Sequence, residues 1–201
     1  MTLQVGIYVY DQVEVLDFAG PFEVFTTASR VHQRLAPGQP PPFAVALVAE
    51  RPGPVTARAG FTVVPHHAFD NHPPLDLLLV PGGVHVAELG KPRVIEWIRR
   101  QAGGARLTAS VCTGAFLLAQ AGLLGGLAVT THWEDVEDLR RQFPGLEVRQ
   151  GVRWIEHERV VTSAGISAGI DMSLRLVARL AGEELAERTA RQMEYDWRKR
   201  A

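Results

Sequence analysis

A single cysteine, Cys112, occupies a position that favours nucleophilic chemistry. It lies between an apolar strand candidate at 106–111 and an apolar helix candidate at 114–121. A side chain at such a turn stands at the carboxyl edge of an α/β sheet, where ligands bind. The helix dipole and free N–H groups there favour thiolate, so we predict a lowered thiol pKa. Gly114 permits a tight turn like the nucleophile elbow of hydrolases, although a lone cysteine is also commonly a small buried hydrophobe.

Two acidic side chains are candidates for proton transfer with this thiol. Asp17 lies inside the apolar run EVLDFAGPFEVF, just before a predicted helix, and Glu23 follows about one helical turn beyond the start of that helix. A carboxyl group close to a thiol could donate or accept its proton. Helix capping by Asp17 and a solvated helix position for Glu23 are the structural alternatives.

Backbone donors for a reaction intermediate are predicted after the strand LDLLLV. Gly82 and Gly83 follow Pro81 there, and consecutive glycines let the backbone approach a ligand with its N–H groups. Together with the N–H of Thr113 they could form an oxyanion hole, although a plain turn is equally compatible.

Histidines offer one further candidate. His132 follows Thr131 at a strand end and could act as a base, or make a structural hydrogen bond at a helix start. The remaining histidines of the segment HHAFDNHPP match no metal or catalytic spacing, so we interpret that segment as a solvated loop.

The elements that must position these residues alternate between strands and helices, and many strands are continuous apolar runs. That pattern is typical of a mostly parallel sheet covered on both faces. We predict one α/β domain over residues 1–201, without repeats or interdomain linkers. The predicted strands are 3–10, 43–48, 55, 61–64, 75–80, 106–111, 128–131, 146–149, 153–156 and 160–162. Six helices are predicted, beginning at Gly20-Pro21, at residue 91, at residue 114, at residue 132, just after Ser167, and at Glu183. The last of these helices is predicted to end with Arg198-Lys199-Arg200.

Composition excludes several function classes. The chain has 201 residues, with 21 Lys+Arg against 22 Asp+Glu and a net charge of −1. Near-neutral charge argues against nucleic-acid binding through a basic surface and against a polybasic membrane anchor. One cysteine allows no intramolecular disulfide and no cysteine-rich zinc module. No signal peptide, membrane span, nucleotide fingerprint or metal motif is found, so we expect a cytoplasmic protein without metal or cofactor.

The combination and order of four stretches resemble the ThiJ/PfpI superfamily, from about residue 3 to residue 197. The stretches are LDFAGPFEVF, LLLVPGG, SVCTGAFLLAQAGLLGGLAVTTHW and TSAGISAGIDMSLRL. The resemblance implies a flavodoxin-like three-layer sandwich, a homodimer, and a reactive cysteine in a strained elbow. The resemblance is strongest to the isocyanide hydratase branch, in which an Asp pairs with the reactive cysteine and a Thr directly follows that cysteine.

Carried onto this chain, those positions are Asp17, Cys112 and Thr113. The resemblance implies that Cys112 attacks the carbon of a small isocyanide, that Asp17 moves the proton, and that water releases an N-substituted formamide. Backbone N–H groups near Gly83 and Thr113 would stabilise the intermediate.

Departures from the other branches leave alternatives open. Thr113 stands where PfpI-type proteases carry His, so protease activity is not expected. Asp17 stands in place of the Glu of the deglycase and glyoxalase-like branches, although His132 matches a histidine near their cysteine. A glyoxalase or deglycase therefore remains an alternative. A non-catalytic small-molecule or redox sensor, related to the sensor domain of AraC-type regulators, is another. We find no helix-turn-helix region in this chain.

Overall fold

The central feature of the fold is a mostly parallel sheet, here described from a computed structural model that covers residues 1–199. In that part of the chain the main sheet has seven strands in the order β10-β11-β7-β6-β1-β2-β5. Neighbouring strands are parallel except β10, which pairs antiparallel with β11. Two smaller sheets pair β3 with β4 and β8 with β9.

The strands are β1 Leu3–Tyr8, β2 Phe43–Ala49, β3 Val55–Thr56, β4 Thr62–Val63, β5 His67–Ala68, β6 Leu77–Val80, β7 Leu107–Val111, β8 Ala128–Val129, β9 Glu147–Val148, β10 Trp154–Glu156 and β11 Val160–Ser163. The α-helices are α1 Val15–Leu35, α2 Val86–Leu89, α3 Pro92–Gly104, α4 Gly114–Gln120, α5 Val136–Gln142, α6 Ala168–Ala181 and α7 Glu183–Gln192. Short 3₁₀ turns lie at Arg58–Gly60 (η1) and Trp133–Asp135 (η2).

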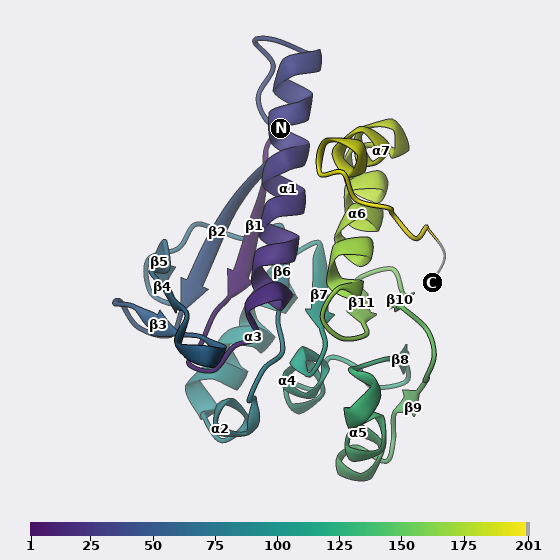
Figure 1. Cartoon of the computed structure of the whole chain (residues 1–201). Helices are drawn as coiled ribbons and strands as arrows, with labels where there is room; N and C mark the ends of the chain where they lie inside the picture. The colour runs from purple at the N-terminus through teal and green to yellow at the C-terminus, as the bar shows by residue number, and fades with distance from the viewer. Residues whose placement is uncertain (200–201) are drawn as a thin grey trace.

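Helices cover both faces of this sheet, which confirms the predicted flavodoxin-like sandwich. Helices α1, α6 and α7 pack together on the face nearest the viewer, and α2, α3 and α4 form a second group behind it (Figure 1). Every residue of β6 and of β7 is buried, as expected for strands with helices on both sides.

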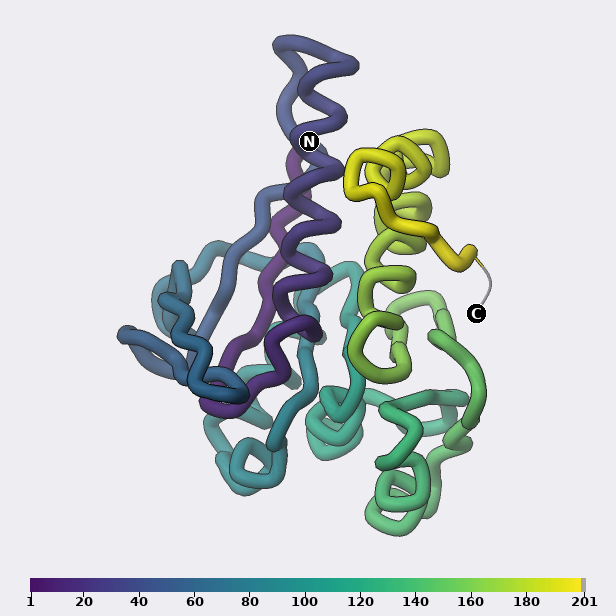
Figure 2. The backbone as a smooth tube through the Cα atoms, in the orientation of Figure 1, coloured from purple at the N-terminus to yellow at the C-terminus, as the bar shows by residue number. Residues whose placement is uncertain are grey.

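The carboxyl ends of the parallel strands gather the loops that carry the candidate chemistry. From β1 the chain passes outward to β2 and β5, then returns to β6 on the other side of β1 (Figure 2). Such a reversal of strand order opens a crevice at the carboxyl edge, where ligands of α/β proteins bind. The segments that leave β1, β6, β7 and β11 at this edge contain Asp17, Gly82, Cys112 and Gly165.

The first helix begins earlier than predicted. The Gly20-Pro21 pair indicates a helix start, but α1 begins at Val15 and Pro21 lies inside it. Proline lacks the N–H that would bond to the carbonyl four residues earlier, which is that of Asp17. The surrounding apolar face nevertheless keeps the helix, with Phe18, Val24 and Phe25 buried. Asp17 therefore belongs to the first turn of α1, not to a loop.

The other boundaries differ from the predictions mainly where elements are short. The final helix α7 ends at Gln192, so Arg198 and Lys199 lie beyond it, while the predicted end at Arg200 falls outside the described residues. Within the segment interpreted as a loop, β5 pairs with β2 at the sheet edge. The single-turn helix α2 was not predicted, because four residues are too few to show helical periodicity.

Candidate active site

Cys112 occupies a strained strand-to-helix turn. Its backbone has φ of 56°, a left-handed conformation that costs a non-glycine residue roughly 1–2 kcal/mol. The turn is held on both sides, because the Cys112 N–H donates to the Ser163 carbonyl at 3.1 Å and Thr131 Oγ1 donates to the Cys112 carbonyl at 2.9 Å. A Cβ on Gly114 would lie 2.1 Å from the carbonyl oxygen of Val80, so this close approach requires glycine.

Asp17 lies beside the cysteine and is buried completely. Its Oδ2 accepts a 3.0 Å hydrogen bond from the Gly82 N–H, and its Oδ1 is buried without a hydrogen-bond partner of ordinary geometry among the described residues. Burial raises the pKa of Asp17 from 3.8 to about 7, while the bond from Gly82 and the interaction with Cys112 lower it. A carboxyl with such a pKa exchanges its proton readily near neutral pH.

The Cys112 thiol does not have the lowered pKa that we predicted. Burial raises its pKa, the charge of Asp17 raises it further, and the Thr113 backbone N–H opposes these effects. The Cys112 residue is only 7% exposed, and α4 is a helix of seven residues. Desolvation therefore outweighs the helix terminus, and the thiol needs a base to become a thiolate.

Thr113 connects the elbow to the glycine loop. Its Oγ1 accepts a 3.0 Å hydrogen bond from the Gly83 N–H and donates a 3.1 Å bond to the Gly83 carbonyl. The predicted oxyanion hole therefore needs correction, because Gly82 already donates to Asp17 and Gly83 to Thr113. These two N–H groups hold the side chains of the site in place and are not free to bind an intermediate.

His132 lines the same cleft as the cysteine. Its Nδ1 lies 3.2 Å from Asp135 Oδ2, and its ring packs so closely on Gly165 that a Cβ there would lie 2.0 Å from the ring. Cys112, Thr113, Gly83 and His132 all line this cleft, which has a volume of about 390 Å³ and is called the Cys112 cleft below. Gly82 and Asp17 are not among the residues that line it.

Five further polar residues of the Cys112 cleft were not predicted: Glu14, Arg58, His85, Glu134 and Asp135. Glu14 and Arg58 form an ion pair of 3.4 Å at its edge, and His85 lines it between the glycine loop and α2. No motif marks them, because Arg58 belongs to a 3₁₀ turn distant in sequence from the other site residues. For His85 the only signal was its place two residues after the glycine pair.

Glu23 is not part of the site. Its carboxylate accepts hydrogen bonds from Thr27 Oγ1 and Arg30, and its side chain is 53% exposed. The reason is helical geometry: once α1 begins at Val15, Asp17 and Glu23 are six residues apart and point in different directions.

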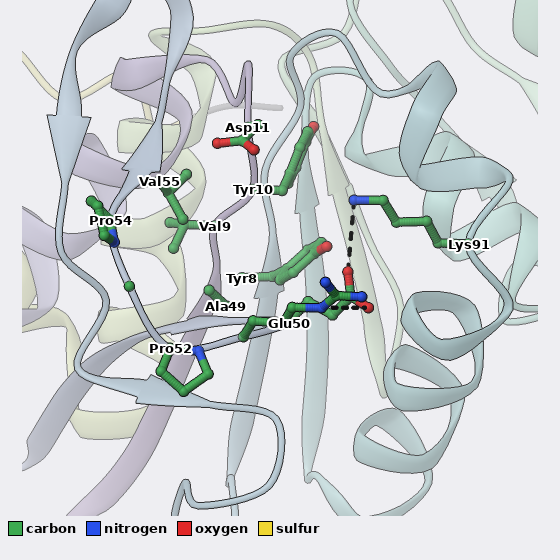
Figure 3. A pocket seen from close by; sticks show the side chains of 12 residues that line it. Tyr8, Val9, Tyr10, Asp11, Ala49, Glu50, Pro52, Pro54, Val55 and Lys91 are labelled. Carbon is green, nitrogen blue, oxygen red and sulfur yellow. Dashed lines mark ion pairs between the residues drawn. The ribbon is translucent and has the colours of Figure 1, made fainter.

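A second cleft of about 290 Å³ opens at the ends of β1 and β2, with Tyr8, Tyr10, Glu50 and Lys91 among its residues (Figure 3). Lys91 Nζ lies 3.7 Å from Glu50. Tyr10 of this second cleft contacts the glycine loop, because its hydroxyl donates a 3.3 Å bond to the carbonyl of Pro81.

Within residues 1–199, no cluster of His, Cys, Asp and Glu side chains has an arrangement suited to a metal ion. In the same part of the chain, no helix combines the length and apolarity needed to cross a bilayer.

These features define a flavodoxin-like α/β protein with a buried cysteine at a strand-to-helix elbow. The chain belongs to the DJ-1/PfpI family, whose sequence model matches residues 3–179. It is 36% identical over 196 residues to isonitrile hydratase of Pseudomonas putida, an alignment that covers 97% of this chain and 79% of that protein.

Regulators are also among the relatives. The chain is 31% identical over 178 residues to the HTH-type transcriptional regulator CdhR of Pseudomonas aeruginosa, covering 89% of this chain but only 51% of the regulator. The chain thus spans about half the length of that relative.

Solved structures agree with the fold. A ThiJ/PfpI family protein from Pseudomonas syringae superposes with a TM-score of 0.85 at 29% identity, covering 98% of this chain and 76% of that one. DJ-1beta of Drosophila melanogaster, which is 18% identical, superposes with a TM-score of 0.81. The alignment covers 98% of this chain and 100% of that one. The latter likeness concerns the fold alone.

Proposed function

We propose that this protein is a cysteine-dependent hydratase that converts small isocyanides into N-substituted formamides. The observation that carries the proposal is the pairing of Cys112 with a buried Asp17 whose pKa lies near 7. An isocyanide needs both a nucleophile and a proton at the same carbon, and this pair supplies both. The similarity to isonitrile hydratase supports the same reaction class.

In the first step, the Asp17 carboxylate takes the thiol proton as Cys112 sulfur forms a bond to the isocyanide carbon. Asp17 then gives that proton to the same carbon, which yields a thioimidate, S–CH=N–R, and restores the carboxylate. In the second step, water adds to the thioimidate carbon. The C–S bond breaks, the formamide leaves, and the second proton of water returns to the sulfur. One isocyanide and one water thus give one formamide.

A substrate panel tests this proposal against the alternatives. Wild type and Cys112→Ser are assayed with para-nitrophenyl isocyanide, methylglyoxal and a peptide, and the products are identified by mass spectrometry. We expect formamide from wild type and none from Cys112→Ser. Consumption of methylglyoxal without formamide formation would assign the glyoxalase alternative instead, and equal turnover by Cys112→Ser would exclude the mechanism.

A sensor role is the second candidate, favoured by the similarity to CdhR. A thiol in a small cleft could be oxidised to a sulfenate or sulfinate. Mass spectrometry after mild peroxide treatment tests this role. Oxygen added to Cys112, together with no turnover of the panel, would favour the sensor. An unmodified Cys112 would count against a redox sensor.

We further propose that the protein forms a homodimer. Val86 lines the Cys112 cleft and is 70% exposed, and Trp133 directly follows His132, which also lines the cleft, and is 67% exposed. Large apolar side chains exposed together are typical of an interface. Sedimentation velocity measures the mass directly, and a 22.0 kDa species at all concentrations would contradict a dimer.

A further inference from the structure

His85 is a buried histidine that has no role in the first step of the proposed reaction. It directly precedes α2, is 9% exposed, and lines the Cys112 cleft together with Cys112 and Thr113. Its ring packs on Phe116 of α4, with the ring centroids 4.4 Å apart. The imidazole is therefore held in one place at the wall of the cleft.

The hydrogen bonding of His85 determines which ring nitrogen is free. Nδ1 lies 3.4 Å from the Gly83 carbonyl oxygen, and a carbonyl can only accept, so Nδ1 carries the hydrogen. Burial lowers the pKa of His85 below 6.5, so the ring is neutral at pH 7. In a neutral imidazole with a hydrogen on Nδ1, Nε2 has an unprotonated lone pair. Among residues 1–199, the His85 ring makes its hydrogen bond through Nδ1, to the Gly83 carbonyl.

The backbone that carries His85 is anchored from the second cleft. The Glu88 N–H donates to the His85 carbonyl at 2.9 Å. The Glu88 carboxylate, 2% exposed, accepts hydrogen bonds from the Tyr8 hydroxyl and, at 2.6 Å, from Lys91 Nζ. Figure 3 shows Tyr8 and Lys91 on the side facing the second cleft. This buried network fixes α2, and with it the position of the imidazole.

We propose that His85 Nε2 is the general base for the water that attacks the thioimidate on Cys112. This inference rests on the proposed hydratase function and adds a residue to its second step. Nε2 takes one proton from water as the oxygen bonds to the thioimidate carbon, and returns that proton to the imidate nitrogen. The C–S bond then breaks, the carbonyl forms, and the remaining hydroxyl proton passes to Cys112 sulfur.

Two other bases must be distinguished from His85 in this step. Asp17 is completely buried and is not among the residues that line the cleft, and the proposed first step already assigns it the transfer of the thiol proton. His132 also lines the cleft, with its Nδ1 3.2 Å from Asp135 Oδ2 and its ring packed on Gly165, an arrangement that likewise leaves Nε2 as the free nitrogen. His132 is therefore the competitor that the experiment must include.

The test separates formation of the thioimidate from its hydrolysis. Wild type, His85→Phe and His132→Phe are mixed with para-nitrophenyl isocyanide, quenched at intervals, and analysed by intact-protein mass spectrometry. Phe at position 85 keeps an aromatic ring against Phe116 but lacks the base. We expect the adduct to form on His85→Phe within about threefold of the wild-type rate, and its hydrolysis to slow by about 10²-fold or more. The adduct therefore accumulates.

Chemical rescue distinguishes a base from a packing residue. His85→Gly removes the ring, and free imidazole at tens of millimolar should restore adduct hydrolysis at least tenfold, without changing adduct formation. Circular dichroism confirms that each variant is folded, and should His85→Phe not fold, His85→Gly decides the question alone. Wild-type hydrolysis rates in His85→Phe, or slow hydrolysis in His132→Phe only, would overturn the role of His85. If wild type itself gives neither adduct nor formamide, the proposed function fails instead.

Discussion

The Gly82 backbone N–H donates a 3.0 Å hydrogen bond to Asp17 Oδ2, which joins the glycine loop after β6 to the first turn of α1. The next residue of that loop is Gly83, whose N–H donates a hydrogen bond to the Thr113 hydroxyl and whose carbonyl accepts one from it. One loop thus positions the acid and the residue after the nucleophile together.

Asp17 makes the folded protein less stable as the pH rises. Burial raises its pKa to about 7, whereas in the unfolded chain it is close to 3.8. Between these values the unfolded chain releases a proton that the folded protein retains, so the free energy of unfolding falls as pH rises and stays low above pH 7. The full difference corresponds to roughly 4 kcal/mol as an upper bound.

Asp17→Asn should therefore be relatively more stable at pH 8 than at pH 4, because the amide cannot ionise. Urea unfolding of both proteins across this range measures the difference. We expect the variant's advantage to grow by several kcal/mol between pH 4 and pH 8, while formamide production is lost. A stability difference that is constant with pH would contradict the raised pKa.

Gly82→Ala should damage the site through steric contact. A Cβ at Gly82 would lie 2.6 Å from Thr113 N and Oγ1 and 2.9 Å from Asp17 Oδ2. We expect a loss of about 1–3 kcal/mol in the free energy of unfolding and a drop in kcat/KM of at least tenfold. Gly125→Ala is the matched control, since a Cβ there meets no atom within 4 Å, and it should behave like wild type. Equal behaviour of the two variants would refute the proposed crowding.

Thr113→Val should loosen the glycine loop while preserving side-chain volume. The valine cannot accept from the Gly83 N–H or donate to its carbonyl, so both bonds are lost. We expect a destabilisation of about 1–3 kcal/mol and reduced turnover. Thr113→Ser retains the hydroxyl and should stay within about 1 kcal/mol of wild type. Chemical denaturation and steady-state kinetics of the pair measure both effects, and a serine variant as impaired as valine would exclude a role for the hydroxyl.

Glu23→Gln should leave the reaction unchanged. The side chain is half exposed and paired with Arg30 at 2.7 Å on the surface of α1. Exposed pairs of this kind contribute about 0–1 kcal/mol, so we expect kcat/KM within twofold of wild type and only a small change in stability. A large loss of activity in the isocyanide assay would restore Glu23 as a candidate acid.

The sequence by itself predicted the order of the main strands and helices, though not the short β5 and α2, because apolar runs and glycine-rich turns are local signals. It also placed Cys112 at a strand-to-helix turn, with Asp17, Thr113 and the glycine pair as its companions. These predictions concern which residues reach the carboxyl edge of the sheet, and the topology of parallel strands brings them there.

Only the tertiary structure decided how these groups interact. The partners of Asp17 and Thr113 are 65 and 30 residues away in sequence, so nothing local indicated that the glycine N–H groups are already bonded. The raised pKa values of Asp17 and Cys112 arise from burial by the whole fold. The position of His85 depends on its contacts with Gly83 and Phe116, and that of Glu88 on its hydrogen bonds with Tyr8 and Lys91. Burial and long-range hydrogen bonding exist only once the chain is packed, and they set the chemistry of this site.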